Sequence, residues 1–499
     1  MSDFPEYDEI HVISDIHMGG DKPDFQILRE TSRLANYIRW VAGQRPEGRV
    51  ALILNGDVID TLAEDIHGYV AVDEAVTILR RIMKDASFSD IWQALADFVK
   101  LQGRTLVIVI GNHDIELSFP VVQHLLITSL AGDDLAARAR IEFSTTGAGY
   151  TCQVGNARVY CTHGNEVDAW NYNRYEDLAK VGRRLNAGRS LDPSEWYPNA
   201  GTRMVKEVMN DVKRRFAWID LLKPETSAAV GTLLVLDPSQ ISKIGKLLSI
   251  VGEKIQGNKQ VDQRLSAEGF HQPDQEIPSS ITVDRLLGPN LKAGILSSAL
   301  PGGRNADDML LTAEENLNRT DAGSTAVDST LGTPQLILDS LTGWMRGVGK
   351  DEALRRALKD WLANDKTFDI TDQDDTYKQV TAVVGPAIDF IVTGHTHLER
   401  AIDMGGGRYY FNSGTWIRLL QFTETMLKDT ATFRPVYDVL IDGKMETIDR
   451  AVFDNRPFVM NQTSAVSIKA ESGQVVGRLL HVMGDGTDAP VEIKRFPEK

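Results

Sequence analysis

The chain has 499 residues, 42% of them hydrophobic and 25% charged, which is enough for a large buried core and for two or three domains. Its formal net charge is −16 at pH 7, which argues against a protein that follows nucleic-acid backbones, because such proteins need a basic surface. No apolar stretch approaches the ~18 residues that span a bilayer. The first residues are acidic and lack the basic and apolar regions of a signal peptide, so we expect a cytoplasmic protein. The two cysteines, Cys152 and Cys161, are expected to be reduced packing residues.

Three apolar runs in the first part of the chain predict buried strands of an α/β sheet. They cover residues 10–14, 50–55 and 105–110, and each is continuous and rich in β-branched side chains. The polar residues that follow them are Asp15, His17, Asp57, Asn112, His113 and Asp114. Because open α/β sheets bind ligands at the carboxyl ends of their strands, these side chains are candidates for one shared site.

Two further blocks have the same form, an apolar run that ends in histidine. They are Thr162-His163-Gly164 and Gly394-His395-Thr396-His397, and five of the ten histidines of the chain fall within the five blocks. Imidazole, carboxylate and amide groups form a mixed nitrogen and oxygen set suited to zinc, iron or manganese. Two divalent cations about 3.5–4 Å apart can supply both a nucleophile and positive charge for the hydrolysis of a phosphate ester. Asp57 suits the position between them, because both of its oxygens can coordinate.

In this order, the five blocks resemble the signature of the calcineurin-like metallophosphoesterase superfamily. The resemblance covers roughly residues 8–168 and 385–420 and implies an α/β fold, the four-layer αββα sandwich of that superfamily. It also implies metal-dependent hydrolysis of a phosphate ester by a hydroxide that bridges two divalent metal ions, manganese, zinc or iron. One metal would be held by Asp15, His17, Asp57 and His397, and the other by Asp57, Asn112, His163 and His395.

The same resemblance assigns catalytic roles to residues that do not bind the metals. His113 would contact the scissile phosphate and protonate or stabilise the leaving oxygen, with Asp114 orienting its ring. Asp60 matches a further acid of the second block. A binding scaffold without catalysis is the alternative from another class, and the presence of every ligand disfavours it.

More than two hundred residues separate His163 from His395, although both would approach the same metal. Since a structureless loop of that length is uncommon, we predict a mainly helical cap inserted over residues 169–384. Its predicted helices cover residues 175–185, 203–216, 241–255, 336–346 and 351–363, and a loop-rich segment covers about 257–335. The catalytic core would comprise residues 1–168 and 385–455, followed by a C-terminal β extension over residues 456–499. Predicted strands in the last part of the chain cover residues 388–393, 408–416, 437–441, 445–448, 465–470 and 475–482.

Side chains of the predicted cap are candidates for substrate binding. Asn165, Trp170 and Arg174 belong to an aromatic and polar stretch directly after His163, which either lines the pocket or anchors the first cap helix. Arg183 and Arg184 lie on a locally basic helix, where they would bind an anionic group or form a solvated face. The basic amphipathic helix at 241–255 leaves open a peripheral contact of the cap with an anionic membrane, with packing against other helices as the default.

Details of the blocks narrow the substrate class. The chain lacks the arginine that phosphoprotein phosphatases carry after the acid of the second block, and it keeps His113 where lipid A pathway pyrophosphatases carry arginine. A histidine in this place favours an ester whose leaving group needs a proton. We therefore predict a small or medium phosphodiester as the substrate, with a phosphomonoester of the nucleotidase or small-molecule phosphatase type as the alternative. The sequence does not indicate the oligomeric state.

Overall fold

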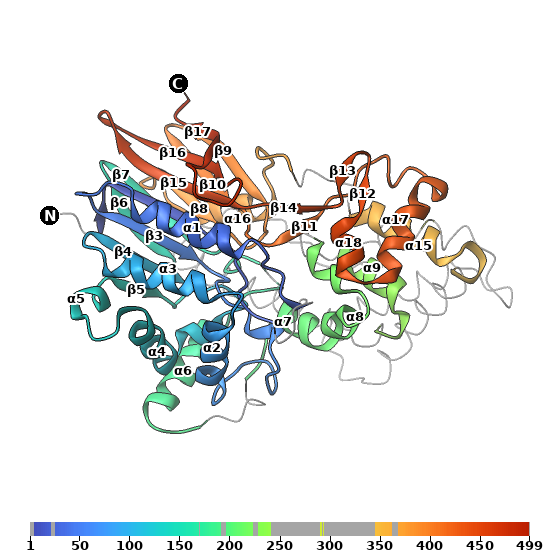
Figure 1. Ribbon diagram of the computed structural model, residues 1–499, viewed down its shortest axis with the longest axis horizontal. Helices are drawn as coiled ribbons and strands as arrows, with labels where there is room; N and C mark the ends of the chain where they lie inside the picture. Colours follow the sequence, from blue (N-terminus) through green and yellow to red (C-terminus); the bar gives the residue numbers. More distant parts are fainter. Residues whose placement is uncertain are drawn as a thin grey trace, which may run out of the picture. The chain divides into compact units, whose positions relative to one another are not determined.

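The computed structural model describes residues 4–20, 25–168, 170–190, 196–222, 228–240, 290–291, 293, 345–361 and 368–498. The chain forms two compact units. Unit 1 consists of Met1–Thr202, Thr367–Leu419 and Asn461–Lys499, and unit 2 of Arg203–Lys366 and Leu420–Met460. Figure 1 shows the elements of both units, coloured along the sequence.

Unit 1 contains a seven-stranded sheet in the order β17-β16-β15-β2-β3-β4-β5. Its parallel part consists of β2 (Glu9–Ile13), β3 (Val50–Asn55), β4 (Arg104–Val109) and β5 (Ile141–Ser144). The antiparallel part consists of β15 (Ser464–Glu471), β16 (Gln474–His481) and β17 (Val491–Phe496). The last strands of the chain thus complete the central sheet, because β15 pairs directly with β2.

A second, six-stranded sheet of unit 1 has the order β1-β6-β7-β8-β10-β9. Its strands are β1 (Glu6–Tyr7), β6 (Tyr150–Val154), β7 (Ala157–Cys161), β8 (Phe390–Thr393), β10 (Arg408–Ser413) and β9 (Glu399–Gly405). β7, β8 and β10 are parallel neighbours. The chain therefore returns from the long insertion directly beside the strand that precedes it.

The two sheets share one hydrophobic core. Val12 and Ile53 from the seven-stranded sheet pack with Val159, Val392 and other apolar residues from the six-stranded sheet, all of them almost fully buried. Their continuous apolar character follows from this burial, since these parallel strands are covered on both faces. Cys152 and Cys161 are also in this core and are free thiols.

Helices cover the outer faces and complete the four layers. α1 (Thr31–Ala42) and α3 (Ser89–Lys100) pack against each other, and α3 contacts β4. On the other sheet, Val380 of α16 (Asp375–Val383) packs against Ile391 and Tyr410. The remaining helices of this unit include α2 (Ala75–Lys84), α4 (Pro120–Ala131), α5 (Leu135–Arg138) and α6 (Tyr175–Asn186). The αββα architecture with added C-terminal strands is confirmed.

The described part of unit 2 is mainly helical. Its helices include α8 (Asn210–Lys213), α9 (Ala228–Leu236), α15 (Lys350–Trp361), α17 (Thr430–Asp442) and α18 (Met445–Arg450). α15 packs against α9 and α17, and Trp218 Nε1 donates a hydrogen bond of 2.8 Å to the carbonyl of Leu440. Two short strand pairs lie in the last third of the chain, β12 (Val452–Phe453) with β13 (Arg456–Pro457), and β11 (Arg418–Leu420) with β14 (Val459–Asn461).

Several predicted helices of the insertion are confirmed. α6 matches the helix expected at 175–185, and α15 matches the one at 351–363. The helix expected at 203–216 is present as α7 (Ala200–Met204), a π-helical turn (Val205–Met209) and α8. The predicted helix at 241–255 lies outside the described residues, as do most of the loop-rich segment at 257–335 and most of the helix at 336–346.

The strands predicted at 437–441 and 445–448 are wrong, because these residues lie in α17 and α18. Asp429 forms a capping box with Thr432, and buried Phe433, Val436 and Leu440 recur at helical spacing. The alternation that suggested strands came from β-branched and aromatic residues on this helix. The capping box at the start of α17 and the burial of one face of this helix outweighed the strand propensity of these residues.

The predicted segment boundaries also differ from the two units. Residues 420–455 were expected in the catalytic core, but they belong to unit 2. Residues up to 202, at the start of the expected cap, belong to unit 1. The physical reason is packing: the first helix of the insertion, α6, contacts α4 of the core.

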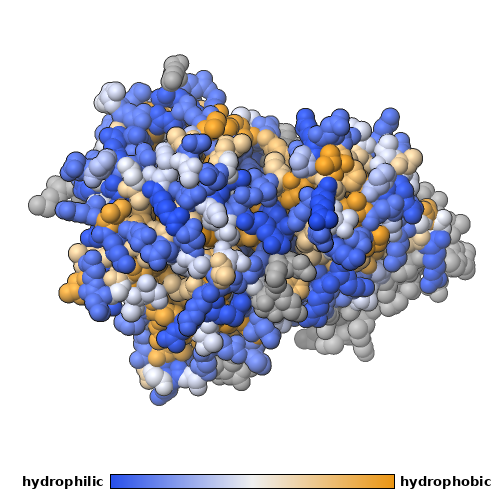
Figure 2. Space-filling model, viewed as in Figure 1, coloured by the Kyte–Doolittle hydropathy of each residue, from blue (hydrophilic) through white to orange (hydrophobic). Residues whose placement is uncertain are grey.

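The surface is mostly hydrophilic on the face seen in Figure 2, with apolar side chains interspersed among polar ones. Among the helices of the described ranges, none is both long enough and apolar enough to cross a membrane.

Candidate metal centre

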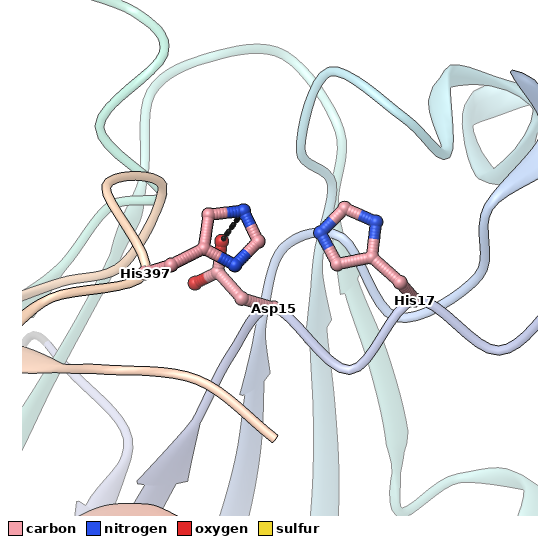
Figure 3. A group of neighbouring side chains, drawn as sticks. All are labelled: Asp15, His17 and His397. Atoms are coloured by element: carbon pink, nitrogen blue, oxygen red, sulfur yellow. Dashed lines mark ion pairs between the residues drawn. The ribbon is translucent and has the colours of Figure 1, made fainter. Parts of the chain in front are cut away.

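The ends of five parallel strands bring the five sequence blocks together. The first three blocks follow β2, β3 and β4 in one sheet, and the last two follow β7 and β8 in the other. His395 donates its backbone N–H to Asp15 Oδ2 at 3.0 Å, which ties the fifth block to the first. Figure 3 shows His397 beside Asp15, with His397 Nε2 3.5 Å from Asp15 Oδ1, and His17 next to them. The rings of His17 and His397 are stacked, with centroids 5.0 Å apart.

Asp57 lies between the two groups of ligands. Its Oδ2 atom is 3.2 Å from His163 Nε2 and 3.7 Å from His17 Nε2. Its Oδ1 atom accepts the backbone N–H of His113 at 2.9 Å. The carboxylate therefore faces histidines from the first and fourth blocks at once, as a residue shared by two cations would.

Five of the seven predicted ligands have a left-handed backbone. Their φ angles are 53° at Asp15, 52° at His17, 52° at Asp57, 71° at His395 and 60° at His397. Only nine non-glycine residues of the described ranges have positive φ, so the strained positions are concentrated at this site. Such residues cost free energy and persist where the surrounding structure requires them, typically at functional sites.

Three glycines of the blocks let the ligands approach one another. A Cβ atom at Gly56 would overlap the His163 ring, and one at Gly111 would overlap the Asp57 carboxylate. A Cβ atom at Gly394 would lie 2.7 Å from Asp15 Oδ2. A glycine is therefore required at each of these positions by the close packing of the ligands themselves.

Gly111→Ala is expected to displace Asp57, because the added Cβ atom would also lie 2.6 Å from the Asp57 backbone nitrogen. We expect the free energy of unfolding to fall by about 1–3 kcal/mol, the usual cost of overpacking, and the metal content to fall with it. Denaturant unfolding and elemental analysis would measure both. Gly385→Ala is the control, since nothing lies within 4 Å of its Cβ position. Unchanged stability and metal content in Gly111→Ala would contradict this account.

His163 and His397, from the fourth and fifth blocks, each have one ring nitrogen already engaged. His163 Nδ1 donates to the carbonyl of Asn55 at 2.8 Å, so Nε2 is the nitrogen that can face a cation. His397 Nδ1 lies 3.1 Å from Thr415 Oγ1, and that hydroxyl donates to the carbonyl of Asp15 at 3.0 Å. The partner of one nitrogen fixes the tautomer, so the other nitrogen presents a lone pair to a cation.

Buried polar atoms without hydrogen-bond partners gather at this site. Within the described residues they include Asp15 Oδ1, both ring nitrogens of His17, Asn112 Oδ1 and His163 Nε2. Leaving a buried group unpaired costs about 1–3 kcal/mol, so such a concentration calls for a ligand. Three groups of side chains place donor atoms close enough to share an ion: Asp15-His17-His397, Asp15-Asp57-His163 and His17-Asp60-His113. This set of nitrogen and oxygen donors fits divalent transition metals.

His113 is oriented by Asp60, and the prediction that Asp114 would orient it is wrong. His113 Nδ1 lies 3.1 Å from Asp60 Oδ1. The two Asp114 oxygens instead accept the backbone N–H groups of Gly111 and Val58, each at 2.7 Å. Asp114 thus holds the loop of the third block against that of the second. Asp60 serves two rings, since its Oδ2 atom is 3.5 Å from His17 Nδ1.

The buried carboxylates shape the charge of the site. Burial favours the neutral His163 ring, but the negative charge of Asp57 outweighs it and raises the pKa of His163 to about 10. Burial, aided by the charge of Asp57, raises the pKa of Asp114 to about 7. The cluster therefore attracts positive charge, which cations supply when they compete with protons for the same atoms.

The predicted substrate-binding residues lie in unit 1, in the stretch after His163 and on α6. Asn165 is fully buried, and its Nδ2 donates to the carbonyl of Asn171 at 3.2 Å. Arg174 forms an ion pair with Asp177 at 2.8 Å. Trp170 is partly buried, and Arg183 and Arg184 are exposed in the last turn of α6. Contact of these residues with a substrate stays a prediction.

Two partners of the ligands were missed by the sequence analysis. Asp168 Oδ2 lies 2.8 Å from His395 Nε2, and Thr415 contacts His397. An acid five residues after His163 was a weak signal for the first. For Thr415 the sequence offered none, because a threonine after a strand is common and its role depends on the fold.

Comparisons with known proteins agree with the sequence blocks. A sequence model of the calcineurin-like phosphoesterase family matches residues 9–222, which contain the first four blocks. Among solved structures, the chain is similar to the crystal structure of a dimetal phosphatase from Danio rerio, at 9% identity over 97% of this chain and 98% of that one. The TM-score of that pair is 0.27, too low to carry an argument. No curated protein sequence matches the chain.

The family match and the strand-end cluster of histidines and carboxylates lead to one conclusion. Residues 9–222 match the calcineurin-like phosphoesterase family, and this match together with the cluster supports a metal-dependent hydrolase of phosphate esters.

Proposed function

We propose that the protein hydrolyses a small or medium phosphodiester with two divalent cations. The proposed ligands are Asp15, His17, Asp57, Asn112, His163, His395 and His397. The support comes from the buried donor atoms without partners and from the position of Asp57 between His17 and His163. When bound, the cations would activate water and neutralise the phosphate oxygens.

The observation that carries the proposed reaction is the pair of His113 and Asp60. His113 is buried, and its Nδ1 atom lies 3.1 Å from Asp60 Oδ1, so we assign the contact with the substrate to Nε2. A carboxylate on one ring nitrogen stabilises the imidazolium form. His113 in that form would interact with the phosphate and transfer its Nε2 proton to the leaving oxygen.

The charge of the site favours a diester over a monoester. A monoester carries about −1.5 to −2 at pH 7, whereas a diester carries a single negative charge. The proposed ligands include two aspartates and neither lysine nor arginine. The second charge of a monoester would therefore rest on the cations and His113 alone. A phosphomonoesterase is the second candidate, supported by the same ligands and by the same histidine.

We further propose that specificity comes from the insertion between β7 and β8. It starts directly after His163 and ends before His395, so the chain enters and leaves it beside proposed ligands. Asn165, Trp170, Arg174, Arg183 and Arg184 are the residues we propose for substrate contacts in its first part. Remote contacts of this kind position a substrate without supplying the nucleophile.

The activity test compares two chromogenic esters on the full chain. The protein is stripped with a chelator, reloaded separately with Mn²⁺, Zn²⁺ or Fe²⁺, and assayed with bis(p-nitrophenyl) phosphate and p-nitrophenyl phosphate. We expect no turnover without metal, restored turnover after reloading, and a higher kcat/KM for the diester. A higher kcat/KM for the monoester would favour the second candidate. Bound metals with no turnover of either ester would point to a binding scaffold.

A further inference from the structure

The stretch that follows His163 contacts two of the blocks that carry proposed ligands. Asp168 Oδ2 lies 2.8 Å from His395 Nε2, in the fifth block. Asn173 Nδ2 donates a hydrogen bond of 2.7 Å to the carbonyl of Gly111, directly before Asn112 in the third block. Asn173 is 2% exposed, so this bond is sheltered from water. One short stretch of chain thus holds two blocks that are 284 residues apart in the sequence, from 111 to 395.

Asp168 is itself held in place by its neighbours. Its Oδ1 atom accepts the backbone N–H of Trp170 at 2.8 Å, and its Oδ2 atom accepts Asn171 Nδ2 at 2.7 Å. The carbonyl of Trp170 accepts the backbone N–H of Gly201 at 2.8 Å. Both carboxylate oxygens are therefore committed to local donors as well as to His395. A carboxylate held this firmly can fix the ring that it contacts.

We propose that Asp168 and Asn173, called the clamp residues, position the metal centre. This inference rests on the proposed function, because it concerns how well the chain binds its cations. Asp168 holds the proton of His395 on Nε2, which leaves Nδ1 as the nitrogen for a metal. Asn173 holds the turn at Gly111, from which the side-chain oxygen of Asn112 is presented.

The clamp differs from the expected role of this stretch as a substrate-binding surface. A residue that binds substrate needs a polar group free to meet it, whereas the Asp168 oxygens and Asn173 Nδ2 already have partners inside the protein. The two roles predict different experimental results. Loss of a positioning residue weakens metal binding, while loss of a substrate contact raises KM and leaves metal affinity unchanged.

The experiment measures the affinity of the full chain for Mn²⁺ and Zn²⁺ by competition with a chelator. It compares the parent protein with Asp168→Ala, Asp168→Asn and Asn173→Ala. Glu74→Gln is the matched control, because Glu74 also contacts a histidine, His67, at 2.8 Å, but on an exposed surface. Thermal unfolding of the metal-free proteins shows whether each variant folds. KM and kcat for bis(p-nitrophenyl) phosphate are measured at saturating metal.

We expect Asp168→Ala to weaken metal affinity about 10–100-fold, the usual effect of removing the partner of a metal-binding histidine. Asp168→Asn keeps an oxygen that can accept the His395 proton, so it should retain more of the affinity than Asp168→Ala. Asn173→Ala should weaken metal binding in the same direction, and Glu74→Gln should match the parent. At saturating metal, the KM of each clamp variant should stay within about twofold of the parent value. The reason is that the clamp residues position the metals and do not contact the substrate.

Two outcomes would contradict the proposal that the clamp residues position the metal centre. These outcomes can be distinguished from each other. If the parent binds two metals and the folded clamp variants bind them equally well, the clamp is wrong while the proposed function stands. A raised KM in those variants would then assign the residues to substrate binding. If the parent itself binds no divalent cation after reloading, the proposed function fails, and the clamp fails with it.

Discussion

Asp57→Asn is expected to lower metal occupancy and to reduce turnover by at least about 10³-fold, since several kcal/mol of charge stabilisation depend on the cations. Asp57 Oδ2 lies within 3.7 Å of ring nitrogens from both His17 and His163, so one lost charge weakens both proposed sites. Asparagine is the substitution that isolates this effect. It nearly matches the size of aspartate and tolerates the left-handed backbone at φ 52°, so folding should be preserved.

Elemental analysis of the purified variant and turnover of bis(p-nitrophenyl) phosphate would measure the two effects. Asp134→Asn is the control, because Asp134 is an exposed aspartate that caps α5 by accepting the N–H of Ala137 at 3.0 Å. It should keep its metals and its rate. Full metal content and an unchanged rate in Asp57→Asn would refute the assignment of Asp57 as the shared ligand.

His113→Ala is expected to keep its metals while the rate falls by about 10²–10⁴-fold, the usual contribution of a positioned acid or base. The reason is that Nδ1 of His113 faces Asp60 and the residue lies outside the proposed ligand set. The loss should shrink as the leaving group improves, because a weakly basic leaving oxygen needs no proton. Equal losses for a nitrophenyl ester and an alkyl ester would show that His113 has another role.

Asp60 provides a second test of this pair. Since Asp60 contacts His113, Asp60→Asn should cost less in a His113→Ala background than in the parent chain. The contact of Asp60 with His17 predicts that part of the loss remains in that background. His67→Ala serves as the control, because His67 is an exposed histidine paired with Glu74, and its rate should be unchanged. Fully additive losses would contradict a functional pair.

The sequence by itself determined the strands of the central sheet and the residues at their ends. The runs at 50–55 and 105–110 are continuous and β-branched, and both are parallel buried strands in the structure. A strand buried on both faces needs apolar residues throughout. Such a run can be recognised from neighbouring residues in the sequence, so these strands were predictable. The helix at 175–185 was predictable for a similar reason, since Leu178 and Val181 lie on one face of α6.

Tertiary structure decided which side chains meet. The sequence placed Asp114 next to His113, yet the loop of the third block turns Asp114 toward backbone N–H groups and leaves the His113 ring to Asp60. It also decided that residues 437–441 form a helix, through the cap at Asp429 and the burial of Leu440. The contact of Asp168 with His395 joins residues from opposite ends of the long insertion. Contacts of this kind depend on how sheets and loops pack, and such packing is determined by the whole chain and not by neighbours in sequence.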